Sequence, residues 1–322
     1  MAGSFQLTSH DNRNHFGCTH RSRNFLFARV TLTEIIAKEQ TVAISTQPID
    51  PAFPLESGAD VTIWWLGQAG FALRHGDDLL FIDPYLSDVL ADKYAGRLFP
   101  HRRLHDAPVA PAAVEGLSTV LCTHGHTDHM DLGAIPLLQT RSDPLFVIPR
   151  SETVKGIGRG IPPARLLGLD AGESFRTRAG VTITAVPAAH EEITVDEHGQ
   201  NLFLGYVLDL GGYRIYHSGD CAPYPGQHEL LRALDLDLAL LPVNGRDAHR
   251  AGNGVPGNFH LEEAVELCRA AGIPRLVCHH WGLFAFNTAQ PDDLRRRLAD
   301  VDDVEWHIPE LGAPFTVGRV LA

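Results

Sequence analysis

Residues 121–131 read LCTHGHTDHMD, the stretch that says most about the fold and the chemistry of this chain. The apolar, β-prone run leading into it predicts a buried strand that ends in a polar cluster. In an extended segment, side chains two positions apart point the same way, so His124 and His126 leave the strand on one side. Asp128 and His129 are adjacent and diverge as the chain turns, so they need not serve the same centre.

The cluster predicts a site for a divalent metal. Its four polar side chains need partners when they are desolvated, and imidazole together with carboxylate suits Zn, Mn or Fe. No thiolate stands among them, which disfavours a purely structural zinc site. The alternative is a polar turn that caps the next helix, and we assign that role to Asp131 alone.

Three other predicted strands end in residues of the same types. His190 follows VTITAVPAA, Asp220 follows GYRIYHSG, and the doublet His279 and His280 follows RLVC. Each is a weak signal by itself, but all of them stand at strand ends, as the first cluster does. We therefore expect them to converge on one rim of the fold and to complete the metal site.

Composition and charge exclude several other classes of protein. The chain has 322 residues, 44% of them hydrophobic, and a formal net charge of −12, which argues against nucleic acid or an anionic membrane as the main partner. No apolar run approaches the ~18–20 residues that span a bilayer, and the first residues lack the order of a secretion signal. The five cysteines show no CxxC pair, so we expect reduced thiols and a cytoplasmic protein.

The pattern of elements predicts an α/β fold. Short β-prone runs such as VTIWWLG, GFALRHG and DLLFIDPYL follow one another closely, as antiparallel strands do. Helical periodicity appears in DLGAIPLLQ, GQHELLRALD, HLEEAVELCRAAG and PDDLRRRLAD. A sandwich of two sheets flanked by helices accommodates both. We expect it to occupy residues 61–322, after a proline-containing linker at 46–60 and an N-terminal extension at 1–45 with one short helix at 31–40.

The order HxHxDH, lone His, GD and late His resembles the metallo-β-lactamase fold hydrolases, and within them the L-ascorbate-6-phosphate lactonase group. The resemblance spans about residues 61–315 and rests on IWWLGQAGF (63–71), IDPYLSD (82–88), THGHTDHMD (123–131), IYHSGD (215–220), LLPVNGR (240–246) and HHWGLFAFN (279–287). It implies an αβ/βα four-layer sandwich with a dinuclear metal site between its two mixed sheets.

The resemblance also implies a ligand set for two divalent ions, Zn or Mn, with Fe as an alternative. By matched position, one ion would be held by His124, His126 and His190, the other by Asp128, His129 and the late histidine, and Asp220 would bridge both. Aligning on WGLFAFN favours His280 as the late ligand and aligning on HH favours His279; we take His280. The lactonase lacks a histidine that matches His190, so binding of a single ion stays open.

Such a centre predicts metal-dependent hydrolysis with water as the nucleophile. Two ions ~3.5–4 Å apart lower the pKa of a shared water toward ~7 and stabilise the developing oxyanion. Asp220 would anchor the resulting metal-bridging hydroxide and Asp128 would orient it. The predicted reaction opens a lactone or a related ester, with a phosphorylated sugar as the type of substrate. The alternatives are a metal-dependent phosphodiesterase and a non-catalytic metal-binding protein on the same fold.

The substrate contacts follow less directly from the sequence. Asn244 and Arg246 come after the predicted strand LDLALLP, where Arg246 could bind an anionic group bidentately; a plain surface arginine is the alternative. His260 begins a predicted helix, and His279 would contact substrate if it is not a ligand. We expect a small, anionic substrate as the partner and neither nucleic acid nor a membrane; a homo-oligomer stays open.

Three related classes of enzyme differ from this chain at defined positions. A flavodiiron oxygen reductase would carry Glu in place of His126, together with a flavin domain. A secreted zinc β-lactamase would use a Cys ligand near Asp220, whereas here Cys221 follows an Asp in the bridging position. A tRNA-processing phosphodiesterase would carry a further HxxEH-like element, which the sequence lacks.

Overall fold

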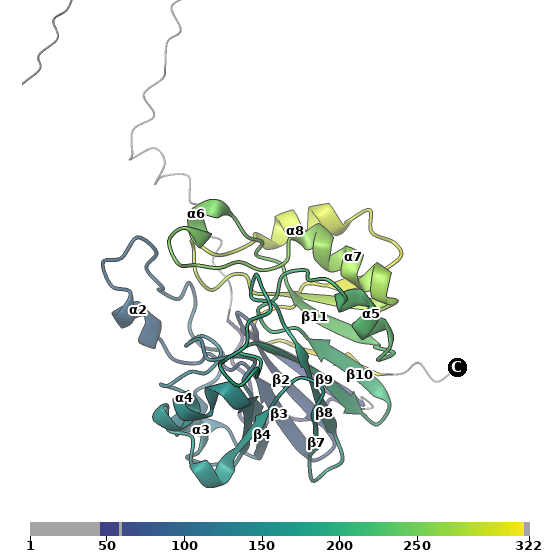
Figure 1. Cartoon of the computed structure of the whole chain (residues 1–322). Coiled ribbons are helices and arrows are strands. Elements are labelled where there is room, and N and C mark those ends of the chain that lie inside the picture. The colour runs from purple at the N-terminus through teal and green to yellow at the C-terminus, as the bar shows by residue number, and fades with distance from the viewer. Residues whose placement is uncertain (1–45, 58–59, 319–322) are drawn as a thin grey trace, which may run out of the picture. The chain divides into compact units, whose positions relative to one another are not determined.

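Two seven-stranded sheets organise the part of the chain that the computed structural model describes, residues 46–57 and 60–318 (Figure 1). The first sheet has the order β14-β1-β2-β3-β4-β5-β6 and the second the order β13-β12-β11-β10-β9-β8-β7. Pairs from β14 to β3 are antiparallel and pairs from β3 to β6 parallel. The second sheet repeats this arrangement, parallel from β13 to β10 and antiparallel from β10 to β7. Two mixed sheets in an α/β fold are as predicted.

The strands and helices have the following bounds. The first sheet contains β1 (Val61–Gly67), β2 (Gly70–His75), β3 (Asp78–Ile82), β4 (Leu117–Leu121), β5 (Leu145–Pro149), β6 (Leu166–Leu169) and β14 (Pro314–Val317). The second contains β7 (Ser174–Arg176), β8 (Thr182–Pro187), β9 (Leu204–Leu210), β10 (Tyr213–His217), β11 (Leu238–Pro242), β12 (Arg275–His279) and β13 (Glu305–His307). The α-helices are α2 (Val89–Lys93), α3 (Ile135–Leu138), α4 (Thr153–Gly158), α5 (Gln227–Arg232), α6 (Ala248–Ala251), α7 (Leu261–Ala271) and α8 (Pro291–Leu298). Short 3-10 turns are η1 (Pro111–Ala113), η2 (Arg150–Glu152) and η3 (Pro163–Arg165).

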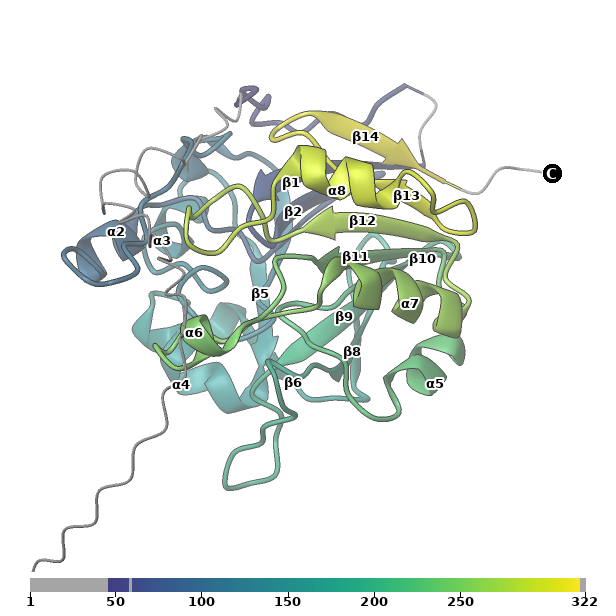
Figure 2. The same cartoon turned by 90° about the horizontal axis from the view of Figure 1, so that it is seen from above.

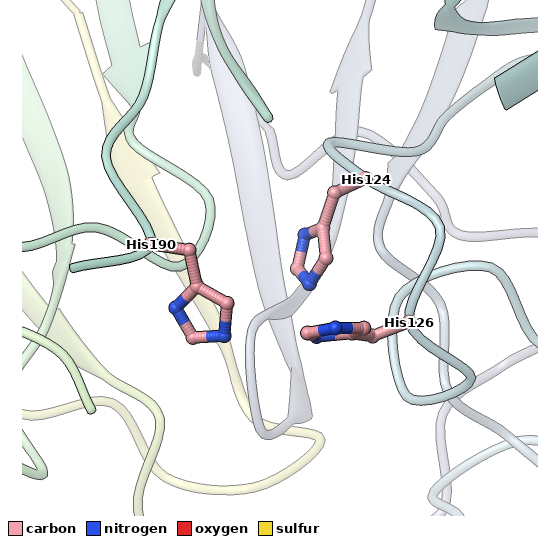
Figure 3. A group of neighbouring side chains, drawn as sticks. All are labelled: His124, His126 and His190. Atoms are coloured by element: carbon pink, nitrogen blue, oxygen red, sulfur yellow. The ribbon is translucent and has the colours of Figure 1, made fainter. Parts of the chain in front are cut away.

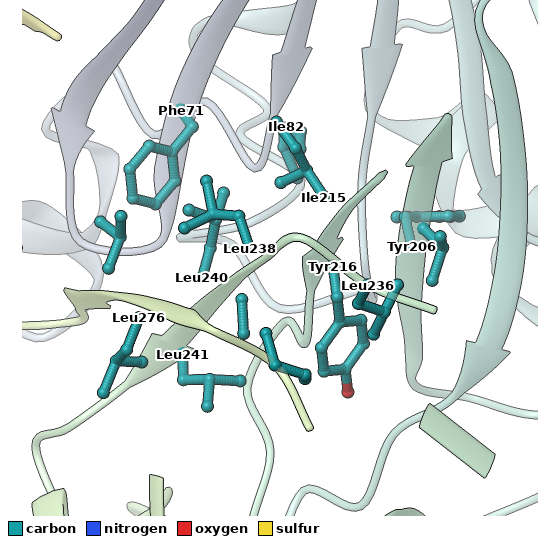
Figure 4. Packing of buried hydrophobic residues seen from close by; sticks show 14 of the residues in the cluster. Phe71, Ile82, Tyr206, Ile215, Tyr216, Leu236, Leu238, Leu240, Leu241 and Leu276 are labelled. Atoms are coloured by element: carbon teal, nitrogen blue, oxygen red, sulfur yellow. The ribbon is translucent and has the colours of Figure 1, made fainter. Parts of the chain in front are cut away.

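The main core lies between the two sheets. Because strand side chains alternate between faces, Ile63 and Trp65 of β1 point inward to this core while Trp64 points to the outer face. Phe71 and Ile82 of the first sheet face aliphatic residues of the second (Figure 4). Burying these faces against each other holds the two sheets together and fixes where their strand ends meet.

Helices cover the outer faces of both sheets. Helices α5, α7 and α8 lie over the second sheet, whereas α3 and α4 lie beside the first (Figures 1 and 2). In α7 the buried residues Leu261, Ala264, Val265 and Cys268 recur at helical spacing. The four helices that the sequence predicts within residues 61–322 all occur, each shorter than predicted. None of the described helices is long and apolar enough to cross a membrane.

The segment predicted to be a linker packs against the domain. Phe53 is completely buried, with its ring edge-on to Trp64 and Phe81 at centroid distances of 5.2 and 5.0 Å. Arg74 donates hydrogen bonds to the carbonyl oxygens of Ala52 and Phe53. Residues 46–57 therefore contribute to the outer core of the first sheet. The helix predicted at 31–40 lies outside the described residues.

Candidate metal centre

The predicted ligands meet where strands of the two sheets end. The first sheet supplies the cluster at 124–129, which follows β4. The second sheet supplies His190 after β8, Asp220 after β10 and His280 after β12. Figure 3 shows His190 facing His124 and His126 from the opposite side. The contact between the two sheets therefore brings together residues far apart in the chain.

The first ligand group consists of three imidazoles. His124, His126 and His190 each offer a ring nitrogen, and these nitrogens lie within 4.8 Å of one another. The ring centroid of His124 lies 4.5 Å from that of His126 and 5.5 Å from that of His190. The Nε2 atom of His124 is buried without a hydrogen-bond partner in the described residues. A buried nitrogen with no partner is costly, and a bound cation would satisfy it.

The second ligand group contains Asp128, His129 and His280, again with donor atoms within 4.8 Å. Asp220 connects this group to the first. Its Oδ2 atom lies 3.3 Å from Nε2 of His129 and 3.7 Å from Nε2 of His190, and its Oδ1 atom lies 3.0 Å from Nε2 of His280. One carboxylate thus contacts a histidine of each group, as a bridging ligand must.

Behind the ligands, Asp83 fixes the ring of His129. Its completely buried carboxylate accepts a hydrogen bond from Nδ1 of His129 at 2.7 Å, which leaves Nε2 facing Asp220. The same carboxylate accepts hydrogen bonds from the backbone N–H and the hydroxyl of Thr123. Carboxylates that orient metal-binding histidines in this way are common in metal sites. No role for Asp83 was predicted from the sequence, because its contact with His129 is made across the fold.

The protonation states of most predicted ligands suit metal binding. Burial, with neighbouring His129, lowers the pKa of His124 well below its usual value, and burial lowers the pKa of His190 to about 4. Burial alone would raise the pKa of Asp220, but His129 and His280 together hold it well below its usual range. Neutral imidazoles and an ionised carboxylate are the forms that bind metals. His129 is the exception, because against the effect of burial Asp220, Asp83 and Asp128 raise its pKa, so a metal would have to displace its proton. With that exchange, the donor set fits divalent cations.

Of the adjacent histidines at the end of β12, only His280 reaches this centre. The ring of His279 is completely buried in the core, stacked on His217 at a centroid distance of 4.9 Å and in a T-shaped contact with the ring of Phe71. The chain turns sharply here, since His280 adopts φ +62°, and this turn sends the two side chains in different directions. The structure thus places His280 beside the other predicted ligands, and His279 in the core, outside the lining of the cavity at the centre.

Two other residues in the cluster lie against neighbouring segments. A Cβ at Gly125 would lie 2.5 Å from side-chain atoms of Glu152 and Lys155, so a glycine there lets these side chains approach the loop. Asp131 does not cap the following helix, whose N-cap is Ala134. Its carboxylate accepts hydrogen bonds from the backbone of Leu86, Ser87 and Gly133 instead. Both residues thus let the loop at 124–131 pack closely against its neighbours, and Asp131 holds it there by these hydrogen bonds.

Arg159 also supports the loop. Its guanidinium donates to the carbonyl oxygens of Gly125, His126 and Met130 at 2.8, 3.1 and 2.6 Å. Cys221, next to the bridging carboxylate, has a different environment. Burial raises its pKa to about 12, and its thiol donates to the carbonyl oxygen of Ala222. It is thus a protonated core thiol rather than a ligand.

A cavity of about 170 Å³ opens onto the ligands. Its lining includes His126, Asp128, His190, Asp220 and His280 from the centre, and Lys93, Tyr94, His101, Arg159, Phe284 and Asn287 around it. The outer lining residues were not predicted from the sequence. They come from loops and short helices, and although Phe284 and Asn287 stand in the HHWGLFAFN stretch, only the fold places these residues beside the predicted ligands.

The predicted substrate contacts lie outside this lining. Arg246 forms a bidentate ion pair with Glu263, at 2.6 and 2.7 Å. Asn244 donates to Oδ1 of Asn287 at 2.7 Å, so it supports a lining residue from behind. His260 is the N-cap of α7, and its backbone N–H donates to Glu263. Arg246 is thus already paired, and His260 has the plain helix-terminal role.

Comparison with known proteins agrees with this geometry. Residues 80–281 match the model of the β-lactamase superfamily domain. The chain belongs to the metallo-β-lactamase superfamily. A metal-dependent hydrolase of Rubrobacter xylanophilus is 28% identical over an alignment that covers 78% of this chain and 94% of its own. A metal-dependent hydrolase of Myxococcus xanthus is also 28% identical, over 82% of this chain and 85% of its own. Together, the family match and these relatives identify the chain as a metal-dependent hydrolase of this superfamily.

Solved structures show the same superfamily fold. A possible metal-dependent hydrolase from Veillonella parvula superposes with a TM-score of 0.64 at 16% identity, covering 80% of this chain and 98% of its own. Igni18, a metallo hydrolase of Ignicoccus hospitalis, gives 0.59 at 17% identity, with coverages of 80% and 99%. The isothiocyanate hydrolase from Delia radicum gut bacteria superposes with a TM-score of 0.62 at 16% identity, covering 80% of this chain and 100% of its own. These likenesses concern the fold.

Proposed function

We propose that this hydrolase binds two divalent ions and opens a lactone, or cleaves a related ester, in a small anionic substrate. The observation that carries the proposal is the position of Asp220, whose two oxygens contact histidines of both ligand groups. In the proposal, His124, His126 and His190 hold one ion, and Asp128, His129 and His280 hold the other. Zn and Mn suit this mixture of imidazole and carboxylate, and Fe suits it as well.

The bound ions would supply an acidified water and a charge that stabilises the developing oxyanion. The chain itself supplies orientation and a proton acceptor. The side chain of Asp128 is 19% exposed and lines the cavity, so it can hydrogen-bond to a water there. Burial opposes its ionisation, but His129 and other neighbours lower its pKa. An ionised carboxylate in this position can orient the attacking water and take up its proton.

The cavity supports a small substrate. Its volume of about 170 Å³ is below the ~300–1,000 Å³ of pockets for drug-sized ligands. Lys93 and Arg159 lie in its lining, and Lys93 has no ion-pair partner within the described residues, so it is available to an anionic group. The lactonase-like assignment, including a phosphorylated sugar as substrate, rests on the sequence stretches named above. Asn244 supports the cavity wall through Asn287.

The remaining expectations about the protein's surroundings also stay proposals. We propose a cytoplasmic enzyme, because a reducing compartment suits its free cysteines, of which Cys122, Cys221, Cys268 and Cys278 are buried. The net charge of −12 favours a small molecule over nucleic acid or an anionic membrane as its partner. A homo-oligomer is compatible with this proposal.

The deciding experiment combines elemental analysis with a substrate panel. Protein purified without added metal or chelator should contain close to two ions per chain, and Asp220→Ala should contain fewer and lack activity. Asp302→Ala, which removes an exposed carboxylate, is the matched control. Hydrolysis of lactones, with much slower cleavage of phosphodiesters, is the expected pattern.

Each other outcome contradicts a defined part of the proposal. The reverse substrate preference would make the protein a metal-dependent phosphodiesterase. Two bound ions with no hydrolysis of either class would make it a non-catalytic metal-binding protein. Full activity in Asp220→Ala would remove the bridging role, and one ion per wild-type chain would exclude the dinuclear centre.

A further inference from the structure

Gln68 has a backbone held in an unusual conformation beside the metal centre. It lies in the turn between β1 and β2 and adopts φ +52°, a region that residues other than glycine rarely occupy. Its carbonyl oxygen accepts hydrogen bonds from the backbone N–H of His280 at 2.9 Å and from Nε1 of Trp65 at 3.0 Å. Strained conformations of this kind persist where the surrounding structure enforces them, often at functional sites.

The side chain of Gln68 points into the second ligand group. Its Nε2 atom lies 3.2 Å from Oδ2 of Asp128 and 3.2 Å from Nε2 of His280. Its other polar atom, Oε1, is buried and has no hydrogen-bond partner in the described residues. The residue is only 1% exposed, so water does not compensate. Its role was not predicted from the sequence.

The two distances match the spacing of atoms that share one metal ion. Ligands bound at ~2.0–2.2 Å in a tetrahedral or more crowded site lie about 3–3.5 Å apart. The inner end of the Gln68 amide has this spacing from two predicted ligands of the second ion. A cation placed among these ligands would therefore meet the amide directly, and it would repel an N–H but bind a carbonyl oxygen.

A carboxamide can contact this position both without metal, through its nitrogen, and with metal, through its oxygen. Its oxygen and nitrogen ends have nearly the same shape, and rotation about its last side-chain bond exchanges them. Without metal, the amide nitrogen donates to Asp128. With metal, the oxygen would face the cation. One end of the amide lacks a partner in either orientation, so the exchange adds little cost beyond the broken hydrogen bond to Asp128.

We propose that Gln68 is a ligand of the second ion, which it binds through its side-chain carbonyl oxygen. This inference rests on the dinuclear centre of the proposed function and adds a ligand to those that the resemblance implies. A neutral oxygen donor raises the coordination number of the second ion above that of the first. Hard oxygen ligands also favour Mn over softer metals, so Gln68 would make the two positions chemically different.

The test is titration of metal-stripped protein with Co²⁺, followed by calorimetry and visible absorption. Wild type should bind two ions, and Gln68→Leu should bind the second about 10–100-fold more weakly, with the first unchanged. The absorption of the second cobalt should intensify in Gln68→Leu, because a lower coordination number gives stronger bands. Gln139→Leu makes the same chemical change at a half-buried site, where the amide contacts backbone carbonyls, and should behave as wild type.

A second variant covers the case in which Gln68→Leu does not fold. Gln68→Glu keeps an oxygen donor but adds a negative charge beside Asp128 and Asp220. It should melt at a lower temperature than wild type without metal, recover with Co²⁺, and bind two ions at least as tightly as wild type. A second-site affinity in Gln68→Glu that is weaker than in wild type would contradict ligation by oxygen.

The outcomes separate this inference from the proposed function. Two ions bound with unchanged affinity and an unchanged cobalt spectrum in Gln68→Leu would overturn the ligand role and leave the dinuclear centre intact. Lost hydrolysis with unchanged metal binding would show that Gln68 acts as a hydrogen-bond donor, which also overturns it. Binding of a single ion by wild type would contradict both proposals.

Discussion

Oδ2 of Asp83 lies 2.7 Å from Nδ1 of His129, and both side chains are completely buried. This hydrogen bond occupies one nitrogen of the imidazole and directs the other, Nε2, to within 3.3 Å of Asp220. Asp83 itself adopts φ +45°. Gln68, Glu191 and His280, which lie in or next to the centre, also have positive φ values. Backbone strain is thus concentrated around the ligands.

Asp83→Asn should weaken metal binding about 10–100-fold. A carboxamide can still accept from His129, but it cannot also accept both hydrogen bonds from Thr123 as the carboxylate does. Competition with a chromogenic chelator measures the affinity. Asp209→Asn, which changes a carboxylate in β9 that contacts Arg214, is the control. An affinity equal to that of wild type would show that Asp83 does not orient His129.

Replacing each histidine of the doublet should separate their roles. His280→Ala removes a predicted ligand, so the bound metal should fall toward one ion per chain and hydrolysis should be lost. His279→Phe keeps a ring in the stack with His217 and should retain both ions and the activity. Metal analysis and turnover measure both effects. Loss of metal in His279→Phe with normal content in His280→Ala would reverse the assignment.

Gly219→Ala should destabilise the protein and displace Asp220. The added Cβ would lie 2.7 Å from the Cβ of Thr123, and Gly219 has φ +63°. We expect a cost of about 1 kcal/mol for the backbone conformation and about 1–3 kcal/mol more for the overlap. Gly116 has φ +70° with open space around it, so Gly116→Ala should show the first cost alone. Denaturant unfolding measures both, and equal losses would exclude the overlap.

The metal-free protein should lose stability in acid partly through His190. Its pKa is about 4 in the folded state, because of burial, and ~6.5 in the unfolded chain. Below pH ~6.5 the unfolded state therefore binds a proton that the folded state rejects. Stability falls as the pH drops toward about 4, by up to about 3 kcal/mol. His129, whose pKa is raised, acts in the opposite direction.

His190→Gln removes the titrating group and leaves His129 in place. As the pH falls from 6.5 to 4, the unfolding free energy of wild type should therefore decrease more than that of His190→Gln. His198→Gln, at an exposed histidine, should leave the pH profile of wild type unchanged. Parallel profiles for wild type and His190→Gln would contradict the prediction.

The sequence predicted elements that carry a local signal. Each strand before a predicted ligand lies in a β-prone run, and α7 has a clear helical period. Strands β6, β7, β13 and β14 were missed, because they are short and none is fully buried. Helix α3 starts later than predicted, since Asp131 binds the backbone at Leu86 and Ser87 instead of capping it.

The sequence predicted most of the residues at the centre that stand in a motif or at the end of a strand. Asp83 and Gln68 lie in stretches that supported the resemblance, yet their roles depend on contacts with residues 46 and 60 positions away. Arg246 shows the reverse. Its place after a strand suggested an anion contact, but Glu263 on α7 binds it bidentately. No local sequence pattern predicts that Glu263 pairs with Arg246.

The two sheets repeat one strand arrangement, and the ligands are divided between them. Each proposed ion would join a histidine that follows β4 in the first sheet to one that follows a strand of the second. Bound metal would therefore act as a non-covalent cross-link at the rim where the sheets meet, comparable to a disulfide that the chain does not contain there. Removing the ions would then loosen the contact between the halves before it disrupts either sheet, because each sheet keeps its own backbone hydrogen bonds.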